Sequence, residues 1–96
     1  MTPPQGPDWA KAACRGMDVD LWFRTGRTPA DQADTRFALA TCTRCQIRIE
    51  CLEDAMREEE GKGYQMRYGI RGGLTKGQRH HLAASRRKAA RAAAAA

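Results

Sequence analysis

The segment Cys42-Thr-Arg-Cys45-Gln-Ile-Arg-Ile-Glu-Cys51 decides the fold, because it holds three of the four cysteines of the chain. A Cys-x2-Cys pair can grip one centre, since two intervening residues bring both sulfurs to the same side of a turn. Cys51 lies on the helix expected to follow and can point back at that centre. The fourth cysteine, Cys14, arrives from a distant segment, and four thiolates suit either tetrahedral zinc or an iron–sulfur cubane.

Other kinds of cysteine site fit this pattern less well. Structural disulfides are rare in the cytosol, where we place the chain because it shows neither a secretory signal nor an apolar stretch that could span a membrane. A thioredoxin-like site at Cys42 and Cys45 needs a strand–helix context that the sequence lacks. Zinc sites usually pair two short cysteine knuckles, and the second knuckle is missing. The spacing of the cysteines alone favours neither an iron–sulfur cluster nor a zinc ion.

The length and composition also favour an inorganic centre. A chain of 96 residues predicts one domain with a thin core, which often needs a metal, a disulfide or a partner to hold it. Only six residues are aromatic: Trp9, Trp22, Phe23, Phe37, Tyr64 and Tyr68. We assign a core role to Trp22 and Phe23, which could also form an exposed patch for a partner, and a core role to Trp9. Phosphate-loop, Ser-His-Asp and paired-carboxylate signatures are absent, so we expect neither an enzyme nor a small-molecule substrate.

The pattern of caps and apolar residues predicts an all-α fold of about four short helices. They cover residues 9–15, 28–42, 46–59 and a basic stretch from residue 75, where Thr75 and Gln78 form a capping box. We expect residues 1–8 to be a disordered lead-in, residues 9–75 the domain, and residues 76–96 a basic, Ala-rich helical tail. The buried stripe of the second helix is expected at Ala30, Ala33, Phe37 and Ala40 or Thr41.

Charge is distributed unevenly along the chain. Residues 1–60 carry eight Lys or Arg and eleven Asp or Glu, whereas residues 61–96 carry nine Lys or Arg and no acid. The acid-free basic tail predicts binding to a polyanion such as DNA. The acidic run Glu58-Glu59-Glu60 is expected to be solvated surface. The candidate DNA contacts are Lys76, Arg79, Arg86, Arg87, Lys88 and Arg91, with Arg79 the first choice for a groove contact.

Three features together resemble the WhiB-like family of actinobacteria and their phages. The cysteine order, one early Cys followed by Cys-x2-Cys-x5-Cys, is similar to the ligand pattern of that family. The segment Asp18-Val-Asp-Leu-Trp-Phe23 resembles its Asp-Pro-Asp-Leu-Phe-Phe segment. Gly69-Ile70-Arg71-Gly72-Gly73 resembles its Gly-Val/Ile-Trp-Gly-Gly turn, which a basic segment follows. The resemblance covers roughly residues 9–88.

The resemblance implies an all-helical domain wrapped around one [4Fe-4S] cluster on Cys14, Cys42, Cys45 and Cys51. It implies a transcription regulator that responds to redox state, oxygen or nitric oxide, and that contacts the C-terminal domain of the principal sigma factor beside promoter DNA. The sigma contacts would be Trp22, Phe23, Gly69, Ile70, Arg71, Gly72 and Gly73. Cluster-free members have been proposed as thiol-disulfide reductases, and here Cys42 and Cys45 would pair most easily.

Three departures from the family pattern are visible in this sequence. Between Cys14 and Cys42 lie 27 residues, which is longer than usual in the family. Arg71 stands where the family has Trp, a residue that packs against the sigma partner. The tail lacks the Arg-Gly-Arg hook of some members. Sigma binding is therefore expected to differ in strength or specificity.

Overall fold

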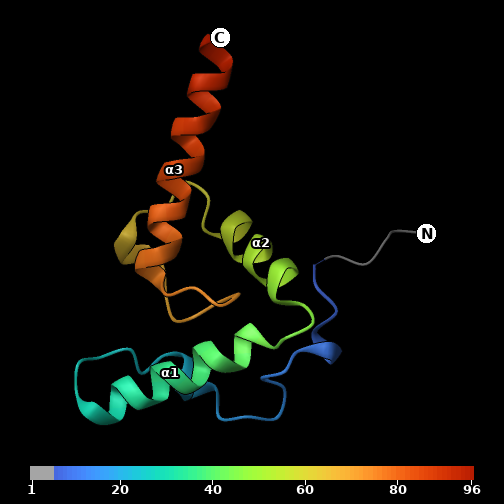
Figure 1. The fold of residues 1–96 in the computed structure, drawn as a ribbon, viewed down its shortest axis with the longest axis vertical. Helices are drawn as coiled ribbons and strands as arrows, with labels where there is room; N and C mark the ends of the chain where they lie inside the picture. The colour runs from blue at the N-terminus through green and yellow to red at the C-terminus, as the bar shows by residue number, and fades with distance from the viewer. Residues whose placement is uncertain (1–5) are drawn as a thin grey trace.

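A computed structural model describes residues 6–96, so the first five residues of the expected lead-in lie outside the described part. The regular elements are helical. The α-helices are α1 (Pro29–Thr43), α2 (Arg48–Glu58) and α3 (Lys76–Ala95), and the short 3-10 turns are η1 (Trp9–Lys11), η2 (Val19–Trp22) and η3 (Tyr64–Met66) (Figure 1). In residues 6–96 the only β pairing is an isolated bridge between Arg71 and Leu74. The predicted all-α class is confirmed.

The two capped helices begin where the sequence predicts. The Thr28 side chain accepts a hydrogen bond from the Asp31 amide (3.1 Å), and Pro29 occupies the first turn of α1. At α3, Thr75 and Gln78 exchange side-chain and backbone hydrogen bonds of 3.2 and 2.9 Å. Both caps are local features, which is why they could be predicted.

The region before α1 is less helical than expected. The helix predicted over residues 9–15 is wrong, because only η1 forms and tight turns follow it, with hydrogen bonds from Arg15 N to Ala12 O and from Met17 N to Cys14 O. Cys14 therefore lies in a turn. Residues 17–26, which the sequence predicts to be a loop, contain η2, whose cap is the Asp18 side chain accepting from the Asp20 amide.

The buried face of α1 differs from the prediction. Ala38 and Thr41 are the buried residues of this helix, whereas Phe37 is 46% exposed and Ala30, Ala33 and Ala40 are exposed. The reason is a non-local one. The large Trp22 side chain of η2 packs into one cluster with the small Ala38, and Ile70 completes it. Of the predicted stripe only Thr41 is buried.

Residues 69–73, which we call the glycine turn, lie between η3 and α3. The amide of Ile70 donates to the carbonyl of Trp22 (2.8 Å), which ties this turn to η2. Gly72, with φ of +59°, lies against α2: a Cβ at this position would be 2.5 Å from the backbone N and Cα of Leu52. Only glycine permits this approach and this backbone conformation. Leu52 and Ala55 form the buried side of α2, beside Ile47.

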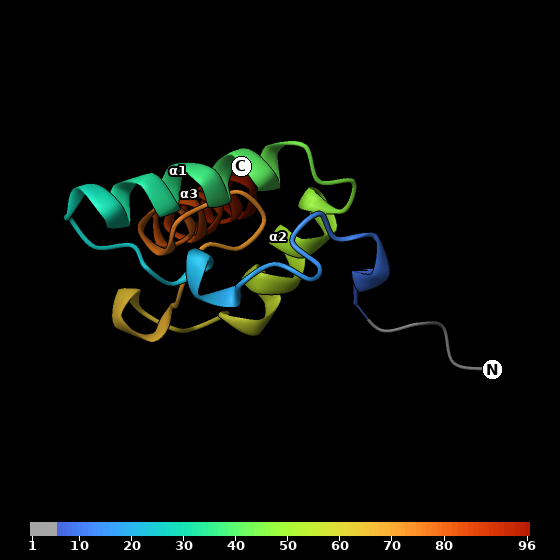
Figure 2. The ribbon, with the colours of Figure 1, turned by 90° about the horizontal axis from the view of Figure 1, so that it is seen from below.

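Helix α3 extends away from the rest of the molecule. Figure 1 shows it rising beyond α2, and Figure 2, turned by 90°, shows it nearly end-on behind α1. All residues from Ala84 to Ala96 are exposed. None of the helices in residues 6–96 has the length and apolar character needed to cross a membrane.

Candidate metal centre and adjoining surfaces

The four cysteines line a single cavity of ≈ 70 Å³. Cys14 comes from the turn after η1, Cys42 from the last turn of α1, Cys45 from the connection, and Cys51 from the first turn of α2. Apolar side chains close the walls, together with the backbone of the glycine turn: Trp9, Ala12, Trp22, Ile47, Ile70 and Gly72. Segments far apart in the sequence therefore meet through their sulfur atoms.

Local hydrogen bonds place the three clustered cysteines. The Cys45 amide donates to the Cys42 carbonyl (3.1 Å), and the Arg48 amide donates to the Cys45 carbonyl (3.3 Å), so consecutive turns lead from α1 into α2. The Cys51 amide donates to the carbonyl of Ile47 (2.8 Å). The helix containing Cys51 begins two residues later and ends one residue earlier than predicted.

Two N–H groups from other segments point at cysteine sulfurs. The Ala13 amide lies 3.4 Å from Cys45 Sγ, and the indole Nε1 of Trp22 lies 3.4 Å from Cys42 Sγ. Donors of this kind stabilise negative charge on sulfur, as they do around metal-bound thiolates. All four thiols are free of disulfides.

The thiols are close enough to influence one another. Burial raises the pKa of Cys14, its own backbone N–H lowers it, and the charges of Cys42 and Cys45 raise it further. Burial likewise raises the pKa of Cys51, against the lowering effects of the Gly72 N–H and of Arg71. Thiolates in one cavity repel one another, and a cationic centre bound among them would stabilise their charged form. In residues 6–96, no three His, Cys, Asp or Glu side chains are arranged to hold one metal ion.

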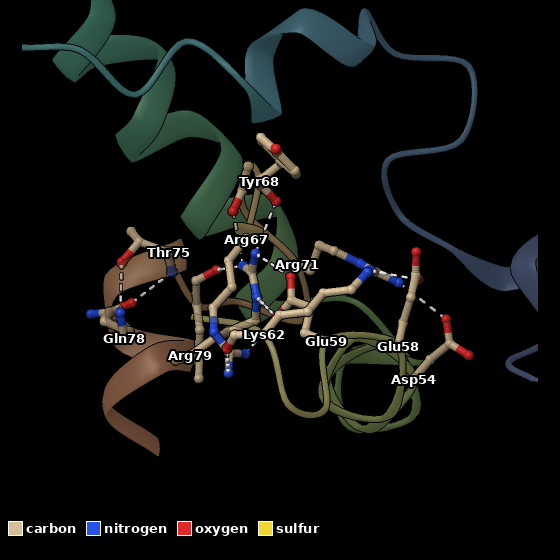
Figure 3. Close-up of polar contacts among 12 residues, drawn as sticks. Asp54, Glu58, Glu59, Lys62, Arg67, Tyr68, Arg71, Thr75, Gln78 and Arg79 are labelled. Carbon is tan, nitrogen blue, oxygen red and sulfur yellow. Dashed lines mark hydrogen bonds and ion pairs between the residues drawn. The ribbon is translucent and has the colours of Figure 1, made fainter. Parts of the chain in front are cut away.

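Arg71, the residue that departs from the family pattern, lies between the cavity and α2. It lines the cavity, and its guanidinium pairs with Asp54 (3.1 Å) and Glu58 (2.8 Å) (Figure 3). Only 23% of its side chain is exposed. Arg71 is therefore an ion-paired part of the domain.

Beneath the turn lies a buried ionic network. Glu59, at the C-cap of α2, is 4% exposed, and its carboxylate accepts from Arg67 and twice from Arg79, at 2.9–3.0 Å (Figure 3). Arg79 also donates to three backbone carbonyls, those of Tyr68, Gly69 and Leu74. The expectation that Glu59 is solvated surface is wrong, because its partners come from distant segments.

The same network corrects the role expected for Arg79. Its side chain has no exposed surface, so it cannot contact a DNA groove. A sequence signal existed: Arg79, Leu82, Ala83 and Arg86 share one helical face, so both arginines lie on the side of α3 that carries its apolar residues. Sequence reasoning missed this face and with it Glu59 and Arg67.

The remaining basic residues of α3 fall into two groups. Arg86 pairs with Glu53 of α2 through two contacts of 2.8 Å. By contrast, Lys76, Arg87, Lys88 and Arg91 have no ion-pair partner in residues 6–96. At about 100° per residue they lie within about a third of the circumference of the helix. These four residues therefore form a basic stripe along α3, whereas the whole basic set, with Arg79 and Arg86 included, spreads around the helix axis as expected from the sequence.

The residues expected to contact sigma factor differ in exposure: some are buried in the core and others lie on the surface. Trp22 and Ile70 are 7% and 3% exposed and belong to the core, whereas Phe23 is 54% exposed. Phe23, Met66, Tyr68 and Arg71 line a surface hollow of ≈ 470 Å³ with Glu58, Glu59 and Lys62. Met66 and Tyr68 were not among the predicted contacts. Trp9, at 47% exposure, is not the core residue expected.

Comparison with known proteins identifies the family. The family model described as "Transcription factor WhiB" matches residues 9–82. The chain is 37% identical over 86 residues to the transcriptional regulator WhiB1 of Bifidobacterium longum, covering 88% of this chain and 84% of that protein. It is 35% identical to the transcriptional regulator WhiB2 of Mycobacterium tuberculosis, over 83% of this chain and 80% of that protein. The chain belongs to the WhiB family.

Proposed function

We propose that this chain is a cytoplasmic, non-enzymatic transcription regulator that holds one [4Fe-4S] cluster on Cys14, Cys42, Cys45 and Cys51. The observation that carries the proposal is that four thiols from separate segments line one cavity. The names of its WhiB relatives support the regulatory role.

The donor set suits a cluster. In a cubane each thiolate binds a different iron, so the ligands surround a volume, as these cysteines surround a cavity. N–H groups of Ala13 and Trp22 already point at two of the sulfurs. Bound here, the cluster would supply a redox-sensitive cross-link between the segment before α1, the α1–α2 connection and α2.

The residues around the cavity explain how its state could reach a partner. The same wall that holds Ile70 and Gly72 continues into the glycine turn, and Arg79 fastens that turn to α3. A redox or nitric oxide signal that releases the four thiols would free the cavity wall and loosen this attachment. The proposed response is therefore a change in the surface formed by the turn and α3.

The partner surface for the C-terminal domain of the principal sigma factor is the hollow around Phe23, Met66, Tyr68 and Arg71. Three large apolar side chains gather there in an exposed position, each at least 53% accessible. Exposed aromatic and Met side chains next to an Arg are typical of protein interfaces. Trp22 and the rest of the turn support this surface from below.

Promoter DNA would lie along the stripe of α3 formed by Lys76, Arg87, Lys88 and Arg91; Lys76, at its N-terminal end, also stands 4.3 Å from the centre of the Tyr64 ring. Side chains of this kind contact phosphates and position the protein without reading bases. Arg79 is excluded from this role because it is buried and pairs with Glu59. Arg86 lies on the face of α3 that pairs with Glu53, so we assign it no phosphate contact in this proposal.

Anaerobic purification with metal analysis tests the proposal. A brown protein with about four irons per chain supports it, as does capture of the sigma-factor domain that is lost after air exposure. A colourless protein with one zinc would instead indicate a zinc-stabilised nucleic-acid or polymerase-binding protein. Turnover of disulfides by metal-free protein, lost in Cys42→Ser, would indicate a thiol-disulfide reductase.

A further inference from the structure

Arg71 is one of two cations on the wall of the cysteine cavity. It stands in the turn, directly before Gly72, and its guanidinium reaches across to α2. The other cation, Arg48, has no carboxylate partner in residues 6–96. Arg71 differs because it brings two carboxylates, Asp54 and Glu58, into contact with itself at the edge of the cavity.

This ionic group lies close to a cysteine. Asp54 and Cys51 are on the same helix, three residues apart and hence on neighbouring positions of one face. Arg71 and Cys51 line the same cavity, on either side of the contact between the glycine turn and α2. Because the Arg71 and Asp54 side chains are only 23% and 27% exposed, water screens their charges incompletely.

We propose that Arg71 raises the reduction potential of a cluster held in this cavity, through its own charge on the cavity wall and by neutralising Asp54, one helical turn from Cys51, together with Glu58. This inference rests on the proposed function. A cubane with four thiolates is negatively charged, and one-electron reduction makes it more negative. A nearby cation stabilises the reduced form, and an unpaired carboxylate destabilises it.

Loss of Arg71 therefore acts in two ways that add. It removes a positive charge from the cavity wall, and it leaves Glu58 unpaired and Asp54 with the exposed Arg57 as its remaining partner. A tryptophan at this position, as in the family pattern, could neither supply the charge nor neutralise the carboxylates. This chain is expected to hold a more easily reduced cluster than its Arg71→Trp variant.

Arg57 offers a matched control. It pairs with the same Asp54 (3.4 Å), but it is 66% exposed and does not line the cavity. Arg57→Gln and Arg71→Gln thus remove the same charge from two partners of one carboxylate. Arg71→Lys keeps the charge, and Arg48→Gln removes the other cation of the wall as a positive control.

The experiment is a redox titration of the anaerobically prepared full-length protein, followed by visible absorbance and electron paramagnetic resonance. For Arg71→Gln we expect a lower midpoint potential. At a fixed applied potential, the ratio of reduced to oxidised cluster should fall at least tenfold, which corresponds to about 59 mV for one electron. Arg57→Gln should match the wild type, and Arg71→Lys should recover most of the shift. The double variant Asp54→Asn/Glu58→Gln should move the potential upward.

The outcomes separate this inference from the proposed function. A wild-type protein that takes up no iron–sulfur cluster overturns both. A wild-type cluster whose potential is unchanged in Arg71→Gln, while Arg48→Gln shifts it, overturns the role of Arg71 alone. An equal shift in Arg57→Gln also overturns it, because the effect would then be one of net charge.

Discussion

Arg79 uses every N–H of its guanidinium inside the protein. One carboxylate and three carbonyls accept these five donors, which fastens α3 to α2 and to the glycine turn at once. Such a pair is costly to bury, and its value lies in specifying one arrangement. Breaking it leaves a charged Glu59 without its main partner.

Removal of Arg79 should therefore destabilise the domain strongly. We expect Arg79→Met to lower the free energy of unfolding by about 3–5 kcal/mol, the range for breaking a buried ion pair. Urea denaturation under anaerobic conditions measures this quantity. The control is Arg87→Met, an exposed arginine of the same helix, which should change it by about 0.5 kcal/mol or less. Equal effects of the two variants would contradict the buried role.

Glu59 predicts a pH dependence. Burial by itself raises the pKa of Glu59, but the hydrogen bonds and charges of Arg79 and Arg67 outweigh it and hold the pKa below its ordinary value. The stabilisation is thus complete above the unfolded pKa of about 4.3 and is lost as pH falls through the lower folded pKa. Comparison with Glu59→Gln isolates this group, because both proteins lose their other acid-sensitive interactions equally. The difference in their unfolding free energies should shrink below about pH 4.3; a constant difference would refute the assignment.

The distant partners of a buried charged side chain are what sequence reasoning could not supply at this scale. The basic character of residues 61–96 was clear from composition, but Arg79 and Arg87 are equivalent in composition and opposite in environment. Glu59 was judged by its acidic neighbours, Glu58 and Glu60. Its partners are 8 and 20 residues away, beyond any local pattern.

At the scale of elements, the glycine turn depends on close contact with α2. We expect Gly72→Ala to lower the unfolding free energy by more than about 3 kcal/mol, because its Cβ would overlap the backbone of Leu52 in addition to the strain of a positive φ. Gly61 also has a positive φ, of +79°, but open space beside it. Gly61→Ala should therefore cost only the strain, about 1–2 kcal/mol, and thermal unfolding distinguishes the two. A similar melting temperature for both variants would argue against the close contact.

The stripe on α3 predicts how binding to DNA depends on salt. Four phosphate contacts give a slope of about −3 to −4 in a plot of log affinity against log salt concentration, and Arg87→Gln should reduce its magnitude by about 0.9. Arg86→Gln removes the same charge from the face that pairs with Glu53, so the slope should stay unchanged. Filter-binding titrations at several salt concentrations measure the slopes of the wild type and of both variants. A response to salt that is flat in the wild type would remove DNA from the proposal.

Elements with local signals were predicted well, and those shaped by tertiary contacts were not. The caps at Thr28 and Thr75 depend on residues three positions away, so the starts of α1 and α3 followed from sequence. The buried face of α1 depends on where Trp22 docks, and the lost turns of the first helix depend on Cys14 reaching the cavity. The four cysteines were found because metal-ligand spacing is itself a local signal for three of them.

At the scale of the whole molecule, the apolar core is small. Its buried hydrophobic residues are Trp22, Ala38, Ile47, Leu52, Ala55 and Ile70. A centre bound by four cysteines would supply cross-links that this core lacks.

Removal of the centre should consequently unfold the domain. We expect chelation to abolish amide protection in α1 and α2 and to reduce the far-ultraviolet dichroism of helices, as in other small metal-dependent domains. Hydrogen exchange by mass spectrometry resolves the helices, with Cys51→Ser as a genetic counterpart. Metal-free protein with unchanged protection would show that the apolar core is sufficient.

The indole of Trp22, 3.4 Å from Cys42 Sγ, has a practical consequence. The chain has two tryptophans, and both line the cysteine cavity. All tryptophan fluorescence therefore comes from the walls of this cavity, and an iron centre bound there would quench it. Tryptophan fluorescence should therefore report, without any added label and in real time, whether the cysteine cavity is occupied.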